Sequence, residues 1–166
     1  MRFIVNGRVW KLGDNINTDL IIPGPYLMLR DLDQMALHVL EGVIPSFSKE
    51  VKSGDIIIAG NNFGCGSSRE IAPIILKHLK VGAVVAESFA RIFFRNAINI
   101  GLPVIQCRDI TKNVLEGQRL KVDLSLGKIE NLSNKEVYQG IKLPEFLLQM
   151  VEAGGAVEAL KRKMGK

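Results

Sequence analysis

The stretch Asn61-Asn62-Phe63-Gly64-Cys65-Gly66-Ser67-Ser68-Arg69-Glu70 joins two apolar segments near the middle of the chain. Residues 55–60 before it are typical of a buried strand, and residues 71–79 after it are typical of a helix. Glycines allow a ligand to approach the backbone, a helix start attracts anions, and an arginine binds carboxylate or phosphate with two hydrogen bonds. The stretch therefore predicts a strand, a tight turn and a helix, with an anion-binding site at the turn.

Two hypotheses account for Ser67. Ser67-Ser68-Arg69-Glu70 matches the S-x-x-E capping box, which would make Ser67 the cap of a helix over residues 67–80 with Pro73 in its early turns. Anion binding accounts better for the second serine, the arginine and the flanking glycines, and the local pattern leaves both hypotheses open. The P-loop pattern is excluded because no lysine precedes Ser or Thr here, and the G-x-G-x-x-G and G-x-S-x-G patterns also fail.

Outward from this stretch, the pattern indicates alternating strands and helices. Residues 82–86 and 102–106 are typical of two further buried strands. Ser88 is positioned to cap a helix through Ile98, and Gly101 to end it. The order β-α-β-α-β over residues 55–106 predicts a largely parallel sheet with right-handed crossovers.

Both ends of the chain suggest antiparallel pairing. Residues 1–12 predict a β-hairpin turning at Asn6-Gly7, and residues 119–124 and 128–132 predict another. A short helix is expected over residues 31–40, a non-helical connection at residues 23–25, and a helical segment over residues 143–163 broken at Gly154-Gly155. We expect one α/β domain over residues 1–166, with a largely parallel central sheet flanked by β-hairpins.

Composition narrows the functional classes. The chain has 166 residues, 47% of them hydrophobic and 23% charged, with a formal net charge of +5. The basic residues are scattered, which argues against a nucleic-acid-binding surface. Two cysteines, Cys65 and Cys107, are too few for a disulfide framework or for an iron–sulfur or zinc site of this chain alone. No signal peptide and no membrane-spanning apolar run is visible, so we expect a cytoplasmic protein.

Other candidate residues have structural interpretations. His38 and His78 fall on predicted helices and leave a serine hydrolase without an obvious histidine partner. Arg91 and Arg95 lie one helical turn apart and are predicted to form structural ion pairs, and Phe93-Phe94 are predicted to lie in the core or in an interface. Asp19, in the polar loop of residues 13–19, is expected either to form an Asx-turn or to orient a hydroxyl or a cation.

Three segments together resemble a known family. They are residues 62–70, the stretch Glu87-Ser88-Phe89-Ala90-Arg91-Ile92-Phe93, and the loop Gly13-Asp14-Asn15-Ile16-Asn17-Thr18-Asp19. They resemble the swivelling domain of the aconitase superfamily, and a chain of this size is similar to the small subunits of the 3-isopropylmalate dehydratase family. The resemblance covers nearly the whole chain and implies a three-layer β/β/α architecture.

The resemblance also implies that the active site is shared between two subunits. A separate large subunit would carry a [4Fe–4S] cluster, and this chain would bind no metal. Ser67 would be the catalytic base that removes a proton next to a carboxylate, Ser68 and Arg69 would bind a carboxylate of a small dicarboxylate substrate, and Asp19 would support the site electrostatically. The reaction would be a dehydration followed by a rehydration, as in leucine biosynthesis.

Substrate choice is expected in the loop Tyr26, Leu27, Met28, Leu29 and Arg30. Relatives that act on tricarboxylates resemble this loop but have an arginine where this chain has Met28, which favours isopropylmalate here. Arg30 is expected to reach the substrate. The alternatives are a small subunit of homoaconitase or of a methylmalate/citraconate-type hydratase, and, in another class, a non-catalytic anion-binding module.

Overall fold

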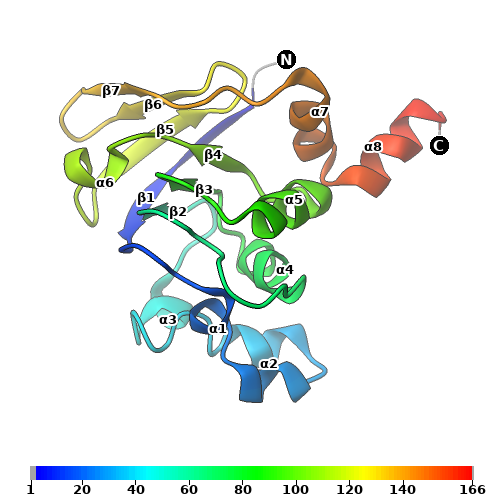
Figure 1. Cartoon of the computed structure of the whole chain (residues 1–166). Helices are drawn as coiled ribbons and strands as arrows, with labels where there is room; N and C mark the ends of the chain where they lie inside the picture. The colour runs from blue at the N-terminus through cyan, green and yellow to red at the C-terminus, as the bar shows by residue number, and fades with distance from the viewer. Residues whose placement is uncertain (1–2, 166) are drawn as a thin grey trace.

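A curled seven-stranded sheet forms the centre of the protein (Figure 1). The computed structural model describes residues 3–165. The strand order is β4-β3-β2-β1-β5-β6-β7. The strands are β1 (Ile4–Lys11), β2 (Ile56–Ala59), β3 (Ala83–Ala86), β4 (Val104–Gln106), β5 (Arg119–Asp123), β6 (Lys128–Asn131) and β7 (Val137–Gln139).

The sheet has a parallel half and an antiparallel half that share β1. Strands β1 to β4 run parallel, with Val9 opposite Ile56 and Ile56 opposite Ala83. Strands β5 to β7 are antiparallel, and Val122 of β5 lies opposite Val5 of β1. The antiparallel strands curl over the parallel ones, which confirms the predicted β/β/α layering and largely parallel centre (Figure 1).

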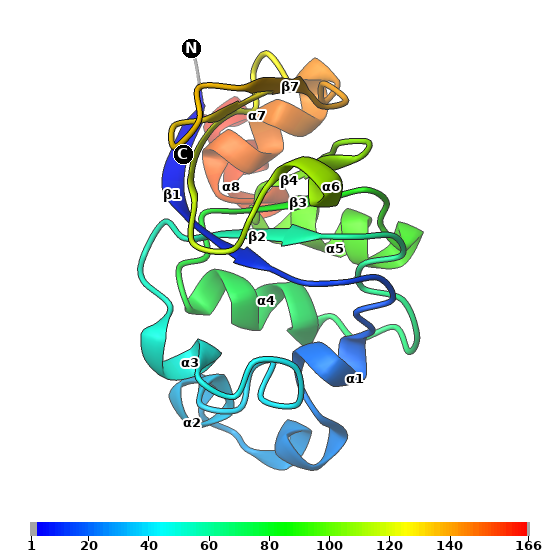
Figure 2. The ribbon, with the colours of Figure 1, turned by 90° about the vertical axis from the view of Figure 1, so that its left-hand side faces the viewer.

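Helices cover the other face of the parallel strands (Figures 1 and 2). Helices α4 and α5 follow β2 and β3 as the predicted crossovers, and α1 to α3 pack beyond α4 (Figure 2). The helices are α1 (Thr18–Ile21), η1 (Gly24–Met28, a 3₁₀ helix), α2 (Leu32–Ala36), α3 (Phe47–Glu50), α4 (Ile71–His78), α5 (Arg91–Ile100), α6 (Ile110–Asn113), α7 (Glu145–Ala153) and α8 (Ala156–Lys163). None of the helices in the described part of the chain could span a lipid bilayer.

The short apolar strands form the core, as their composition predicted. All four residues of β2 and all four of β3 are buried, because the helices cover one face and the antiparallel strands the other. Strands buried on both faces are apolar at every position rather than at alternate ones. Phe93 also lies in the core, as expected, and Gly101 ends α5 in the left-handed conformation with a φ of 80°.

The predicted N-terminal hairpin is wrong. Asn6 and Gly7 lie inside the continuous strand β1, whereas Met1 and Arg2 of that prediction lie outside the described residues. A side chain at Gly7 would overlap the carbonyl group of Gly54. The glycine therefore allows the two backbones to approach closely and does not form a turn. The hairpin predicted from residues 119–132 is confirmed as β5 and β6.

Two predicted helix starts are also wrong. Helix α4 begins at Ile71, which places Pro73 in its first turn, where a missing N–H costs no hydrogen bond. Helix α5 begins at Arg91 with Ala90 at its cap position, and the Ser88 hydroxyl instead accepts a hydrogen bond from the Asn62 N–H at 2.8 Å. Neither helix has a side-chain cap.

Several short elements were not expected from the sequence. The segment expected to be a non-helical connection starts η1, because prolines fit the first positions of a helical turn. The predicted helix over residues 31–40 is shorter, as α2, and α3, α6 and β7 were not predicted. After β7 the Ile141 N–H donates to the Gln106 carbonyl of β4 at 2.8 Å, which brings the two edges of the curled sheet together.

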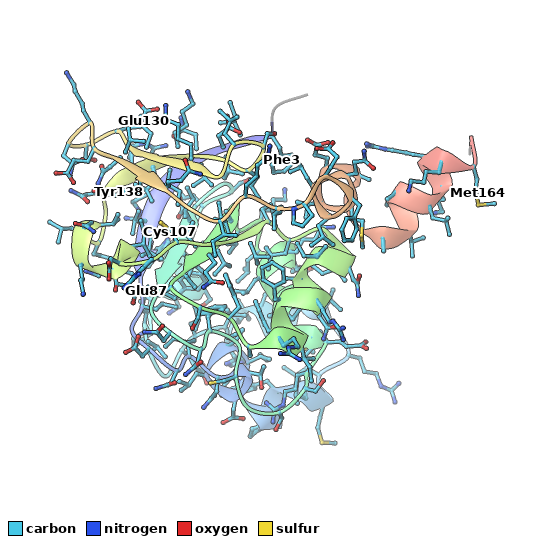
Figure 3. All side chains as sticks on the ribbon, turned by 45° about the horizontal axis from the view of Figure 1, so that its top comes forward. Phe3, Glu87, Cys107, Glu130, Tyr138 and Met164 are labelled. Atoms are coloured by element: carbon cyan, nitrogen blue, oxygen red, sulfur yellow. The ribbon has the colours of Figure 1, made fainter. Side chains whose placement is uncertain are left out.

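The C-terminal helices form the predicted pair. Helix α7 ends at Ala153 and is capped by Gly154, which has a φ of 93°, and α8 follows directly after Gly155. Helix α8 extends away from the sheet, with Met164 just past its outer end (Figures 1 and 3).

Candidate active site

Three loops meet at the carboxyl ends of parallel strands. They are the loops after β1, β2 and β3, and ligand sites in parallel α/β sheets occur at this edge. The Gly60 N–H donates to the Gly13 carbonyl at 3.0 Å and the Asn15 N–H to the Asn61 carbonyl at 2.8 Å. A side chain at Gly60 would overlap the carboxylate of Asp14, so this glycine permits the first two loops to pack closely.

The loop of residues 13–19 fixes the turn that carries Ser67. The Gly64 N–H donates to the Ile16 carbonyl at 2.8 Å and the Thr18 N–H to the Cys65 carbonyl at 2.9 Å. The buried Thr18 hydroxyl donates to the Ser67 carbonyl at 2.7 Å. Three hydrogen bonds thus connect two segments that lie about fifty residues apart in the sequence.

The turn presents unused hydrogen-bonding groups. Among residues 3–165, the peptide N–H groups of Ser67, Ser68 and Arg69 and the hydroxyl of Ser67 donate to no acceptor. The capping-box hypothesis is therefore wrong, because α4 starts four residues after Ser67 and has no side-chain cap. Successive free N–H groups before a helix form an anion-binding concavity, which agrees with the other hypothesis.

Asp19 holds Arg69. One Asp19 carboxylate oxygen, Oδ1, accepts from Arg69 Nη1 at 3.1 Å and from the Gly24 N–H at 3.1 Å. Arg69 Nη1 also donates to the Ile22 carbonyl at 3.1 Å. Both hydrogen bonds of the guanidinium use Nη1, so its remaining N–H groups are left for a ligand. Asp19 therefore orients the arginine and connects it to the first residue of η1.

Ser67, Ser68 and Arg69 line one pocket of about 190 Å³. No carboxylate lines this pocket, and its wall includes two arginines. The lining residues are Thr18, Gly64, Gly66, Ser67, Ser68, Arg69, Ala90, Arg91, Ile92, Phe93 and Asn96. A cavity of this size with arginines, hydroxyls and free peptide N–H groups suits a small carboxylate ligand.

The predicted substrate loop lies outside this lining. Tyr26, Leu27, Leu29 and Arg30 do not line the pocket, and Met28 is 86% exposed. The base of the loop is nevertheless adjacent, since Gly24 lies against the Arg69 guanidinium and the Asp19 carboxylate. The roles of Tyr26 to Arg30 in substrate choice, and of Ser67, Ser68, Arg69 and Asp19 in the reaction, remain predictions.

The first residue of the predicted substrate loop, Tyr26, stacks on His38. The rings of Tyr26 and His38 are parallel with centroids 3.6 Å apart, and His38 Nδ1 lies 2.9 Å from Glu41 Oε2. The hydrogen bond with Glu41 raises the pKa of Tyr26, and the hydrogen bond with His38 lowers the pKa of Glu41. The other histidine, His78, pairs with Asp33 at 2.7 Å. Neither histidine lines the pocket, which agrees with their structural interpretation.

Thr18 and Arg91 are among the pocket residues that the sequence pattern did not indicate. Thr18 belongs to the polar loop of residues 13–19, and its position before Asp19 gives no separate signal. Arg91 and Arg95 were both expected to form structural ion pairs, and that prediction is wrong. Both arginines are exposed, and neither pairs with a carboxylate within residues 3–165. Arg91 instead lines the pocket.

The described residues do not fit a metal cluster. Within residues 3–165, no three His, Cys, Asp or Glu side chains come close enough to hold a metal ion. Cys65 lies half-buried in the turn before Ser67, and Cys107 is buried after β4. Burial raises the pKa of the Cys107 thiol to about 11, which disfavours the thiolate that metals bind.

Comparison with known proteins agrees with this geometry. Residues 41–110 match the family model described as the aconitase C-terminal domain. The chain is 53% identical to the isopropylmalate/citramalate isomerase small subunit of Methanocaldococcus jannaschii, over 100% of this chain and 99% of that one. It is 52% identical to the methanogen homoaconitase small subunit of Methanothermobacter thermautotrophicus, over 95% of this chain and 91% of that one.

A solved structure shares the whole architecture. The crystal structure of 3-isopropylmalate dehydratase from Methanocaldococcus jannaschii has a TM-score of 0.91 and 41% identity, and covers 98% of this chain and 96% of that chain. Fold and pocket together define a domain of the aconitase C-terminal type. The chain belongs to the family of 3-isopropylmalate dehydratase small subunits, which confirms the family indicated by the sequence.

Proposed function

We propose that this chain is the small subunit of a hydro-lyase that interconverts 2-isopropylmalate and 3-isopropylmalate, a step of leucine biosynthesis. One observation carries the proposal. The free Ser67 hydroxyl, three free peptide N–H groups and the oriented Arg69 guanidinium converge at one pocket. The names of relatives about 50% identical over nearly the full length support the same activity.

In this proposal Ser67 removes the proton next to a substrate carboxylate. A serine hydroxyl is a weak base, and its deprotonated form requires strong stabilisation. The free N–H groups of the turn and the guanidinium of Arg69 supply positive potential at that position. Ser68 and Arg69 hold the carboxylate as negative charge develops on it, and Asp19 keeps Arg69 in place through the 3.1 Å hydrogen bond.

The remaining part of the site is proposed to come from a large subunit. The names of the relatives as small subunits support such a partner. The [4Fe–4S] cluster would belong to that subunit, because the described residues of this chain do not fit it. Exposed apolar side chains suit coverage by a partner, such as Ile92 of the pocket lining at 52% and Met28 of the predicted substrate loop at 86%. The complex is proposed to act in the cytoplasm, where two unpaired cysteines are stable.

Met28 supports isopropylmalate as the substrate. An apolar side chain can contact an isopropyl group, and it would leave a third carboxylate without a hydrogen-bond partner. A wider range is the second candidate, because the printed name of the M. jannaschii relative includes citramalate and that of the M. thermautotrophicus relative is homoaconitase. All three substrates share the carboxylate that Arg69 would bind.

The test is an assay of this chain reconstituted with its cluster-bearing large subunit. Turnover would be measured with isopropylmalate, citramalate and cis-homoaconitate. Preference for isopropylmalate supports the proposal, and preference for cis-homoaconitate contradicts the assignment of Met28. Binding of these acids without turnover by the complete complex would favour a non-catalytic anion-binding module.

A further inference from the structure

Arg91 lines the pocket with Ser67, Ser68 and Arg69, and the sequence resemblance assigned it no role. We propose that Arg91 binds the second carboxylate of the dicarboxylate substrate. The inference rests on the proposed function and adds to it a second cationic group in the same pocket.

Backbone pairing fixes the segment that carries Arg91. The Phe63 N–H donates to the Ser88 carbonyl at 3.0 Å, and the Ala90 N–H donates to the Phe63 carbonyl at 2.9 Å. Phe63 and Phe89 thereby form a parallel bridge beyond the ends of β2 and β3. Arg91 follows Ala90 directly, so its backbone is held against the loop that leads to Ser67.

Side-chain packing fixes the first turn of α5 in the same place. Any side chain at Gly64 would overlap the ring of Phe93, so the turn of residues 64–66 lies directly on α5. The buried Phe93 ring also packs edge-on against Phe63, with centroids 5.2 Å apart. Because this packing fixes the backbone at Arg91, less conformational entropy is lost when the Arg91 side chain binds a ligand in the pocket.

The charges of the pocket leave room for a second anionic group. Asp19 already neutralises much of the charge of Arg69, whereas Arg91 has no carboxylate partner within residues 3–165. No acidic residue lines the pocket. A dicarboxylate brings two negative charges, and each is bound best by its own guanidinium. Arg69 and Arg91 match that requirement, and the carboxylate on Arg91 would be the one remote from the abstracted proton.

Arg95 provides a matched control on the same helix. It lies one turn after Arg91, is also exposed without a carboxylate partner within the described chain, and does not line the pocket. The two arginines therefore share helix, exposure and charge, and differ in their access to Ser67. Replacing each by glutamine separates local binding from the loss of one positive charge.

The experiment compares Arg91→Gln and Arg95→Gln in the reconstituted complex, with saturating large subunit. For Arg91→Gln we expect KM for isopropylmalate, and Ki for the competitive inhibitor isopropylsuccinate, to rise about 10- to 100-fold, since a charge-assisted pair is lost. We expect kcat to fall much less, because this carboxylate does not react. Both constants should stay within about twofold for Arg95→Gln.

Two results would overturn the inference. One is a KM for Arg91→Gln equal to that of Arg95→Gln. The other is a weaker association of Arg91→Gln with the large subunit, measured by calorimetry, with an unchanged KM in the saturated complex, which would make Arg91 an interface residue. Failure of the proposed function is a separate result, namely a wild-type complex that does not turn over isopropylmalate.

Discussion

The Thr18 hydroxyl donates a 2.7 Å hydrogen bond to the carbonyl oxygen of Ser67, across 49 residues of sequence. Thr18 is 3% exposed, so its hydroxyl is held in one position. This bond fixes the backbone of the proposed base from the loop that also supplies Asp19. The position of Ser67 therefore depends on a residue that takes no part in the proposed chemistry.

Thr18→Val should lower both stability and activity. The substitution leaves the Ser67 carbonyl without its donor, and we expect a loss of about 1–3 kcal/mol in the free energy of unfolding. Displacement of Ser67 should reduce kcat of the complex by about tenfold or more. Urea denaturation of the chain and steady-state kinetics of the complex measure the two effects.

Thr111→Val is the control for that variant. Its hydroxyl donates to Glu87 Oε2 at 2.9 Å, and it does not line the pocket. We expect a similar loss of stability with kcat unchanged. Equal kcat values for the two variants would show that the Thr18 bond does not position Ser67.

Gly64→Ala should destabilise the chain more than Gly117→Ala. Both glycines have a φ of 82°, a conformation that costs alanine about 1–2 kcal/mol. Nothing lies within 4 Å of a Cβ at Gly117, whereas one at Gly64 overlaps the Phe93 ring. We expect the overlap to add about 1–3 kcal/mol to the loss at Gly64. Equal unfolding free energies for the two variants would contradict the close packing of Phe93 of α5 against Gly64.

Met28→Arg should shift substrate preference without affecting folding. Met28 is 86% exposed, so the free energy of unfolding should change by less than about 0.5 kcal/mol. An arginine there could pair a third carboxylate, and we expect the ratio of kcat/KM for cis-homoaconitate to that for isopropylmalate to rise about tenfold or more. An unchanged ratio would show that Met28 does not determine substrate preference, which contradicts the role predicted for the loop of residues 26–30.

Cys65 and Cys107 should differ in reactivity. Burial raises the pKa of Cys107 to about 11, so only about one thiol in a thousand is ionised at pH 8, and the side chain is 2% exposed. We expect a disulfide reagent to modify Cys65 and not Cys107 in the native chain at pH 8, and both in denaturant. Mass spectrometry of the labelled peptides identifies the modified cysteine, and native labelling of Cys107 would contradict its burial.

The parallel half of the fold was predictable because its strands are continuous apolar runs joined by helices. The N-terminal strand was not, because Asn6-Gly7 is a strong local turn signal and the reason for Gly7 is a contact with Gly54, distant in sequence. The same limit applies to the site. Ser67, Ser68 and Arg69 stand together in the sequence, but the pairing of Thr18 with Ser67 and the placement of Arg91 arise only when separate loops meet.

The central claim is that Ser67 is the base of a dehydratase site completed by a large subunit. The most direct test is kcat for isopropylmalate of the complex carrying Ser67→Ala, with binding of isopropylsuccinate as the measure of an intact pocket. We predict a fall in kcat of about 10²- to 10⁴-fold with inhibitor affinity retained. A kcat within about threefold of the wild-type value in that complex would contradict the assignment.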